Sequence, residues 1–272
     1  MGYPTIDAPY GFKPVNLIGG QVFSGSTREY PIAYNYGTAI FYGDPVTLSS
    51  GFIVIATAPI NTTNTTVGVF LGCSYTDVVT KQKRFSQYYP ANTLAGDIRA
   101  IVCDDPDTVF KMAVVTAAGT PTIASASQLL VGQNMAANTT TGSTATGNSA
   151  GGVVAASANT ANAGFRILGL VPDTQVATSC TYVSGTGTTS IVVSGLTVGQ
   201  VIPVGTDMFQ VVAANGQLQW VGVVSTAATV SSATSQTLTM AANTTASGTL
   251  ALVQSPEVLA KINFNVHRYN IA

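Results

Sequence analysis

The feature that most restricts the fold of this chain is its division into short apolar runs. Between residues 15 and 115, runs rich in β-branched and aromatic side chains alternate with Gly, Pro and Asp. Runs of this kind favour β-strands, and their close spacing predicts an antiparallel β-sandwich or β-barrel. No run approaches the length of a membrane-spanning helix, so no membrane partner is expected. The runs include IFYGDPVTL, GFIVIATA, VGVFLGCSYTDV, DIRAIVCDD and TVFKMAV.

Residues 176–253 repeat strand, Gly turn and strand, and Asp207 is their only charged residue. The pair Asn215–Gly216 between MFQVV and LQWVG predicts a two-residue hairpin turn. The size and even strand spacing favour a small Ig-like β-sandwich, with Trp220 as its core anchor. The charged tail SPEVLAKINFNVHRYNIA resembles the first region in style, so we interpret 176–253 as a domain inserted into a parent domain.

The first fourteen residues predict an extended arm. Pro4, Pro9 and Pro14 exclude a helix and favour polyproline II geometry. An aromatic arm of this kind either folds back on its own domain or lies on a neighbouring molecule, and composition leaves both open. The predicted fold is therefore all-β and has three parts: an arm at 1–14, a discontinuous parent domain at 15–175 plus 254–272, and an inserted domain at 176–253.

The uncharged stretch between residues 112 and 165 is the least regular part of the chain. The segment TIASASQLLVGQ is compatible with one short helix. The segment AANTTTGSTATGNSAGG is rich in Thr, Gly, Ser and Asn, so it predicts a long loop.

Charge argues against several functions. Charged residues make up 8% of the chain and the net charge is −1. Nucleic-acid binding needs a basic stripe, and the only basic cluster is KQKR at residues 81–84, so no nucleic-acid partner is expected. A nearly neutral surface associates readily, which hints at a protein of an assembly. The N-terminus lacks a secretory signal pattern, and Cys73, Cys103 and Cys180 form no C-x-x-C motif, which fits synthesis in a reducing cytoplasm.

The stretch DIRAIVCDDPDTVF holds four of the nine aspartates. A calcium site is one interpretation, but the Gly and Glu of an EF-hand loop are missing. Asp97 also lies about 23 Å from the other three if the run between them is extended. Asp-Pro-Asp forms turns through Asx geometry, so we predict a structural turn made by Asp104, Asp105, Pro106 and Asp107.

Nothing in the sequence indicates catalysis, a cofactor or a metal. His267 is the only histidine, which excludes a two-histidine metal site, and a G-x-S-x-G elbow is absent. We expect His267 on a polar strand edge or in a hydrogen bond between subunits. Cys103 lies beside two aspartates that disfavour its thiolate, so it is a poor nucleophile.

Seven segments resemble, in order, the head decoration (cement) proteins of tailed bacteriophages. The resemblance covers roughly residues 8–175 and 254–272. In that family the Ile-Leu-Gly-Leu strand runs almost directly into the closing Lys-Ile-Asn strand, whereas about eighty residues intervene here. The matching segments are YGFKPVN, GVFLGCSY, YYPANT, AIVCDDPDTVFKM, STATGNSAG, FRILGLVPDT and LAKINFNVHRY.

The resemblance implies a virion structural protein, made in the host cytoplasm, that binds the outer face of the capsid. Its implied partners are the major capsid protein and further copies of itself, with a trimer favoured. The inserted domain is expected to face outward. The residues expected to contact the capsid or a neighbouring copy are those of the arm: Tyr3, Pro4, Pro9, Tyr10 and Phe12.

The alternative is a phage tail, fibre or surface adhesin protein, which would share the β-rich, Thr-rich, sparsely charged character. Exposed Trp, Tyr or Asn side chains of the insert would then bind a host glycan or receptor. A hydrolase and a major shell subunit are further alternatives; the second usually has a long helix and a charged extended loop, and neither is evident.

Overall fold

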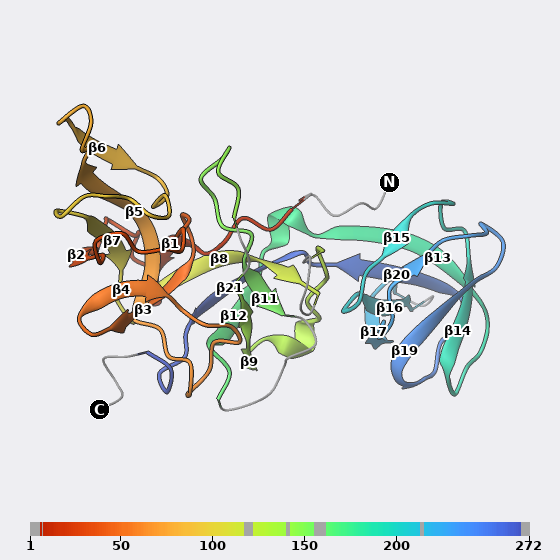
Figure 1. Cartoon of the computed structure of the whole chain (residues 1–272). Coiled ribbons are helices and arrows are strands. Elements are labelled where there is room, and N and C mark those ends of the chain that lie inside the picture. Colours follow the sequence, from red (N-terminus) through yellow and green to blue (C-terminus); the bar gives the residue numbers. More distant parts are fainter. Residues whose placement is uncertain are drawn as a thin grey trace.

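The computed structural model describes residue 6 and residues 8–116, 122–139, 142–154, 162–212 and 215–267. The protein is all-β, as predicted. Three sheets follow one another along an elongated body, from the β2–β7 sheet at one end, through a central sheet, to the sheet of residues 176–254 at the other (Figure 1).

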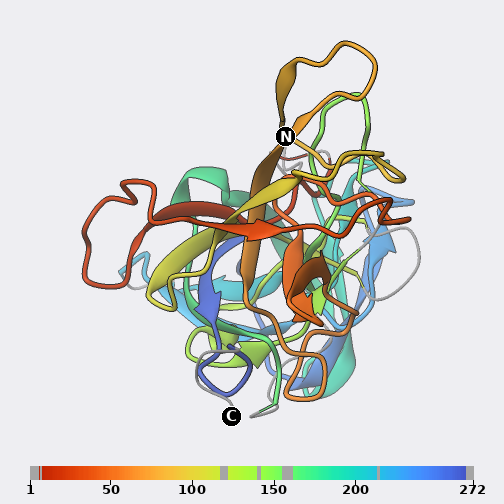
Figure 2. The same cartoon turned by 60° about the vertical axis from the view of Figure 1, so that its left-hand side comes forward.

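The first sheet contains β2 (Arg28–Pro31), β3 (Pro45–Ser49), β4 (Phe52–Ile55), β5 (Gly68–Thr76), β6 (Lys83–Ser86) and β7 (Arg99–Cys103). The order is β2-β7-β5-β3-β4, and β6 pairs with the outer half of β5. The β5–β6 hairpin projects from the body in both views (Figure 2). The inner face of this sheet packs on its own core, which includes Ile40, Ile53, Phe70, Tyr89 and Val102.

The central sheet contains β1 (Lys13–Leu17), β8 (Thr108–Val115), β9 (Asn134–Met135), β10 (Ala137–Asn138), β11 (Gly152–Val154), β12 (Phe165–Leu170) and β21 (Glu257–Ile262). The order is β10-β11-β8-β21-β12-β9, with β1 on β8. The pairs are antiparallel except β11 with β8. Its core includes Phe12, Phe110, Met112, Phe165 and Val258.

The third sheet contains β13 (Val176–Ser184), β14 (Thr188–Ser194), β16 (Asp207–Val211), β17 (Leu218–Val223), β19 (Gln236–Thr244) and β20 (Thr249–Gln254), in the order β17-β16-β20-β13-β14-β19. A bridge between Val224 and Met240 joins its two margins, so the sheet curls like a barrel. β15 (Val201–Ile202) and β18 (Ala228–Thr229) form a separate ribbon. This single curled sheet does not specifically show the two facing sheets of an Ig-like domain.

The apolar core of the third sheet comes only from residues 180–252. Its members include Cys180, Ile191, Met208, Leu238 and Leu252. The strands on either side of this segment, β12 and β21, are antiparallel neighbours in the central sheet, and Leu170 is the ladder partner of Val258. The chain therefore leaves and re-enters the central sheet at adjacent points. This supports the predicted domain division, which stays a prediction.

Three local predictions differ from the structure. The segment predicted as a short helix holds only the 3-10 turn η1 (Gln128–Leu130), because Ser127 caps it and Val131 is already extended. A second 3-10 turn, η3 (Pro172–Thr174), follows β12. The hairpin at Asn215–Gly216 exists, but its connection is longer than two residues: β16 ends at 211 and β17 begins at 218. Trp220 is 43% exposed, so it is not the core anchor.

Candidate functional site

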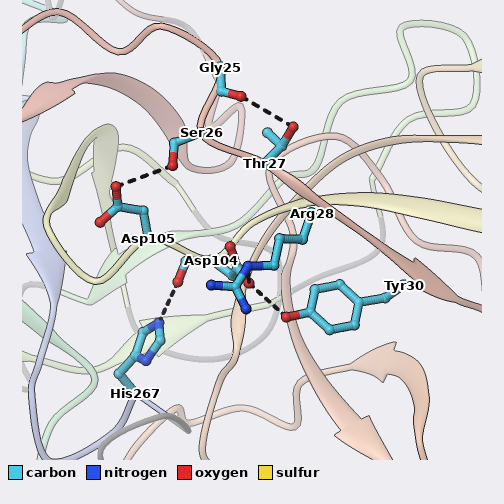
Figure 3. A network of polar contacts seen from close by, with 8 residues as sticks. All are labelled: Gly25, Ser26, Thr27, Arg28, Tyr30, Asp104, Asp105 and His267. Carbon is cyan, nitrogen blue, oxygen red and sulfur yellow. Dashed lines mark hydrogen bonds and ion pairs between the residues drawn. The ribbon is translucent and has the colours of Figure 1, made fainter.

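The Asp104 carboxylate is the centre of a buried polar network at the end of β7 (Figure 3). The Tyr30 hydroxyl donates to its Oδ2 at 2.7 Å, and Arg28 Nε lies 3.4 Å from the same oxygen. Both partners come from β2, which pairs with β7. Because the Arg28 side chain is mostly exposed, water screens this ion pair, and the tyrosine hydrogen bond orients the carboxylate.

His267 approaches the same residue from the C-terminal side of the chain. Its Nε2 lies 3.1 Å from the Asp104 carbonyl oxygen, and its side chain is fully buried. Burial lowers the pKa of His267, against the opposing effect of Asp104, so the neutral ring donates to the carbonyl. The expected polar strand edge or inter-subunit bond is therefore wrong. His267 instead ties the end of the chain to the β7–β8 connection.

Asp104, Asp105, Pro106 and Asp107 lie between β7 and β8. The Asp107 amide donates to Asp105 Oδ1 at 2.9 Å, and the Thr108 amide donates to the Asp105 carbonyl at 3.1 Å. These bonds close an Asx turn, the geometry expected from Asp-Pro-Asp. Ser26 Oγ donates to Asp105 Oδ2 at 3.3 Å. A surface hollow of about 380 Å³ lies between residues 25–28 and 104–106.

Asp97, the fourth aspartate of the stretch DIRAIVCDDPDTVF, lies apart from the other three. Asp97 accepts hydrogen bonds from the Thr76 amide at 2.9 Å and from Lys83 Nζ at 2.9 Å, where β5 ends and β6 begins, beside the loop of their hairpin. These contacts, the Thr76 amide foremost, lower the pKa of Asp97. Within the described ranges, no three His, Cys, Asp or Glu side chains come together to hold a metal ion. The aspartates thus form two separate structural contacts.

The three cysteine thiols are free and buried. Burial raises the pKa of Cys103 to about 11, and that of Cys73 and Cys180 to about 12. A thiol with such a pKa carries almost no thiolate at neutral pH, so these side chains are poor nucleophiles. For Cys103, the main cause is burial rather than the neighbouring aspartates that the sequence pointed to.

The described part of the N-terminal arm folds back on its own domain. Phe12 is fully buried in the central core and stacks on Phe165 with 4.6 Å between ring centroids. The Tyr10 hydroxyl donates to Glu257 Oε1, and Lys13 Nζ lies 4.4 Å from the Tyr10 ring centroid. Phe12 therefore has no surface to offer a partner, which corrects the prediction for that residue.

The remaining arm residues differ in what the structure says of them. Pro9 and Tyr10 are half-buried. Tyr3 and Pro4 lie outside the described residues. The strand β1 begins at Lys13, so the arm ends before the predicted boundary at residue 14. Partner binding by Tyr3, Pro4, Pro9 and Tyr10 stays a prediction.

Asp207 fixes the third sheet to the central region, a role that sequence reasoning missed. Its buried carboxylate accepts from Ser127 Oγ at 2.6 Å, from the Gln128 amide at 2.8 Å and from Trp220 Nε1 at 3.1 Å. Two of these donors precede the insert in the sequence and one belongs to it. The sequence does indicate this role, because Asp207 is the only charged residue of a long segment, and a buried charge needs hydrogen-bond donors around it.

Gly205 allows the third sheet and the segment around Ser125 to approach closely, next to the clamp formed by Asp207 with Ser127, Gln128 and Trp220. The Ser125 amide donates to the Val204 carbonyl at 2.9 Å. A Cβ atom on Gly205 would lie 1.8 Å from the Ser125 carbonyl oxygen, and Gly205 has φ of +85°. Only glycine fits this conformation and this approach.

Comparison with known proteins adds no relative. No family model, curated protein or solved structure matches this chain. Among the described residues, no helix has the length and hydropathy needed to cross a membrane. The phage decoration resemblance therefore stays a prediction that depends on the order of its motifs.

Proposed function

We propose that this protein is a virion structural protein that decorates the outer surface of a tailed-phage head and stabilises it. The supporting observation is the pairing of β12 with β21. These strands carry the FRILGLV and AKIN segments, which the resemblance places almost in succession, and here they are ladder partners despite the intervening residues. The insert then replaces a simple connection at one end of a decoration-type sheet.

Several features fit a binding role rather than catalysis. The polar network around Asp104 links β2, the β7–β8 turn and His267: Tyr30 and Arg28 contact the carboxylate, and His267 contacts the carbonyl oxygen. The partners that we propose are the major capsid protein and further copies of the chain, with a trimer favoured. A decorating protein that binds only the assembled shell stabilises it by linkage, and several weak contacts per oligomer raise the avidity.

Electron microscopy of virions labelled with an antibody against this chain tests the proposal. We expect label over the head facets. Label confined to tails, or particles without label, would contradict decoration. A second variant tests the placement of the insert: replacing residues 176–253 by a short turn between β12 and β21 should leave head binding intact, because the insert faces outward. Loss of binding by this variant, if it is folded, would contradict that placement.

A tail, fibre or adhesin protein is the second candidate, and Trp220 is the observation that favours it. This side chain is 43% exposed on the insert, and a half-exposed indole is a common stacking surface for sugars. Label on the tail, combined with quenching of Trp220 fluorescence by a host surface glycan, would favour this candidate over decoration.

A further inference from the structure

The β5–β6 hairpin and β7 expose an aromatic side chain beside a hollow. Phe85 is 80% exposed, although it belongs to a strand. An adjacent hollow of about 470 Å³ is lined by Leu71, Ile101, Tyr42 and the edge of Phe85 itself. An exposed phenylalanine next to an apolar-walled hollow is an unusual pair for a surface that meets only water.

Register shows that this pair lies on the outer face of the sheet. Phe85 and Arg99 are both ladder partners of Ser74, and Ile101 is the partner of Gly72. Directly opposed residues share a face, and neighbours along a strand alternate, so these residues face away from the core side of Ala100 and Val102.

The hollow exists because Gly72 has no side chain. A Cβ atom there would lie 3.0 Å from the Ser86 carbonyl oxygen, and φ is +142°, which side chains rarely tolerate. The register of β5 with β7 also shifts between Phe70 and Gly72, which bends the strand at this point. The floor of the hollow is therefore built by backbone geometry and is kept open by the fold.

We propose that Phe85 and this hollow form a two-fold contact with a second copy of the chain, in which Phe85 of each copy enters the hollow of the other. An isologous pair requires a protrusion and a matching recess on one face, and both are present here. The hollow is larger than a benzyl group, and an aromatic anchor in an apolar recess is the usual centre of a protein interface.

Charge favours a second copy over other occupants. The outer face carries both an exposed acid, Glu29, and an exposed base, Arg99. A partner surface that is only acidic or only basic would be repelled by one of these two residues. A second copy related by a two-fold axis instead places its Arg99 towards Glu29 and its Glu29 towards Arg99. The net charge of −1 leaves little repulsion between copies.

The edge of the sheet is a less suitable contact than its face. β6 is a four-residue edge strand that carries Lys83 and Arg84, and short charged edges discourage strand-to-strand pairing. The proposed contact is also separate from a trimer interface, since a ring of three uses two different surfaces on each copy. It therefore stands whether or not the protein decorates a phage head.

Sedimentation of the purified full chain over a range of concentrations tests the contact. We expect wild-type protein to double in mass as its concentration rises towards about 1 mM, the weak end of specific association. Phe85→Asp and Ile101→Lys should each weaken this doubling at least about tenfold. Val79→Ser is the matched control, because Val79 is 84% exposed on the same hairpin but does not line the hollow, and it should associate like wild type.

Mixing the two variants is the decisive measurement. In a mixed pair, the Phe85 of the Ile101→Lys chain meets a hollow that keeps Ile101, Leu71 and Tyr42, and the introduced aspartate meets the introduced lysine. The equimolar mixture should therefore regain the doubling that each variant lacks alone. Circular dichroism of each variant confirms that it is folded.

Four results would overturn the proposal. They are a wild type that never doubles, folded variants that double normally, a mixture that fails to regain the doubling, and a Val79→Ser control that loses it.

Discussion

Different kinds of interaction stabilise the parent region (residues 15–175 and 254–272) and the insert (residues 176–253). In the described residues, every ion pair joins side chains of the parent: Arg28–Asp104, Lys83–Asp97, Arg84–Asp77, Lys111–Glu257 and Lys261–Asp107. Apart from the bond between Trp220 and the Asp207 carboxylate, the insert uses hydroxyl and amide contacts such as Gln200 to Thr178 and Gln210 to Ser247. Charge-based contacts respond to pH and salt, whereas neutral hydrogen bonds do not. The two regions should therefore respond differently to the same change of solution.

The largest expected effect is a loss of stability in the core of the parent that leaves the core of the insert unchanged. Phe12→Ala removes a fully buried ring that stacks on Phe165, so it should destabilise the parent by about 4 kcal/mol. Hydrogen exchange should accelerate in β8, β12 and β21 and stay slow in β13–β20. Phe264→Ala, at a 66% exposed site, is the control and should change little. Equal acceleration in β13–β20 would show that the two regions unfold as one unit.

The next effect tests the clamp between the regions. Asp207→Ala leaves Ser127, Gln128 and Trp220 without their shared acceptor, which should cost about 3 kcal/mol in denaturant unfolding. The fluorescence of Trp220, the only tryptophan, should shift because its indole loses the carboxylate. The exposed Asp173→Ala variant serves as the control. If both variants lose the same stability, the clamp is not significant.

A third effect concerns pH in the parent. Asp44 is fully buried, and burial raises its pKa from 3.8 to about 6, which the hydrogen bond from the Phe41 amide only partly offsets. A raised carboxyl pKa destabilises the fold as pH rises through this range. Asp44→Asn should therefore stabilise the protein at pH 7 by about 3 kcal/mol, and the gain should vanish below about pH 4.

Thermal unfolding of wild type and Asp44→Asn across pH 4–8 measures this difference. His267 has the opposite effect on both proteins, because its lowered pKa makes acid destabilising, so it cancels in the comparison. A gain that is constant with pH would contradict the assignment to Asp44. Asp207→Asn, in the insert, should show no gain at pH 7, since that carboxylate already has three donors.

The smallest effect concerns the surface ion pairs. Lys83→Gln removes the exposed partner of Asp97 and should cost less than about 0.5 kcal/mol, because water screens the pair. The cost should disappear in about 1 M salt. The pKa of Asp97 should stay lowered, since the Thr76 amide is the main cause, and NMR titration of Asp97 measures this. A return to the ordinary value would make Lys83 the dominant partner instead.

Strand positions were the most predictable part of the fold. The runs VGVFLGCSYTDV and DIRAIVCDD contain β5 and β7, and TVFKMAV covers β8 except its last residue, because alternation and β-branched side chains act locally. Long-range partners were not predictable in this way. The Trp220 indole donates to the Asp207 carboxylate on the neighbouring strand, and the buried Phe12 stacks on Phe165, more than a hundred residues away. Phe85 directly follows the basic cluster KQKR, which indicates an exposed strand. Composition alone did not show that Phe85 itself is exposed.

The adjacency of Leu170 and Val258 makes the central sheet a natural platform for display. Whatever polypeptide stands between those two positions, its ends emerge side by side, so the ladder of β12 with β21 can form without regard to its length. A foreign module with closely spaced termini could therefore be exchanged at this point, provided that it brings its own partner for Ser127 and Gln128.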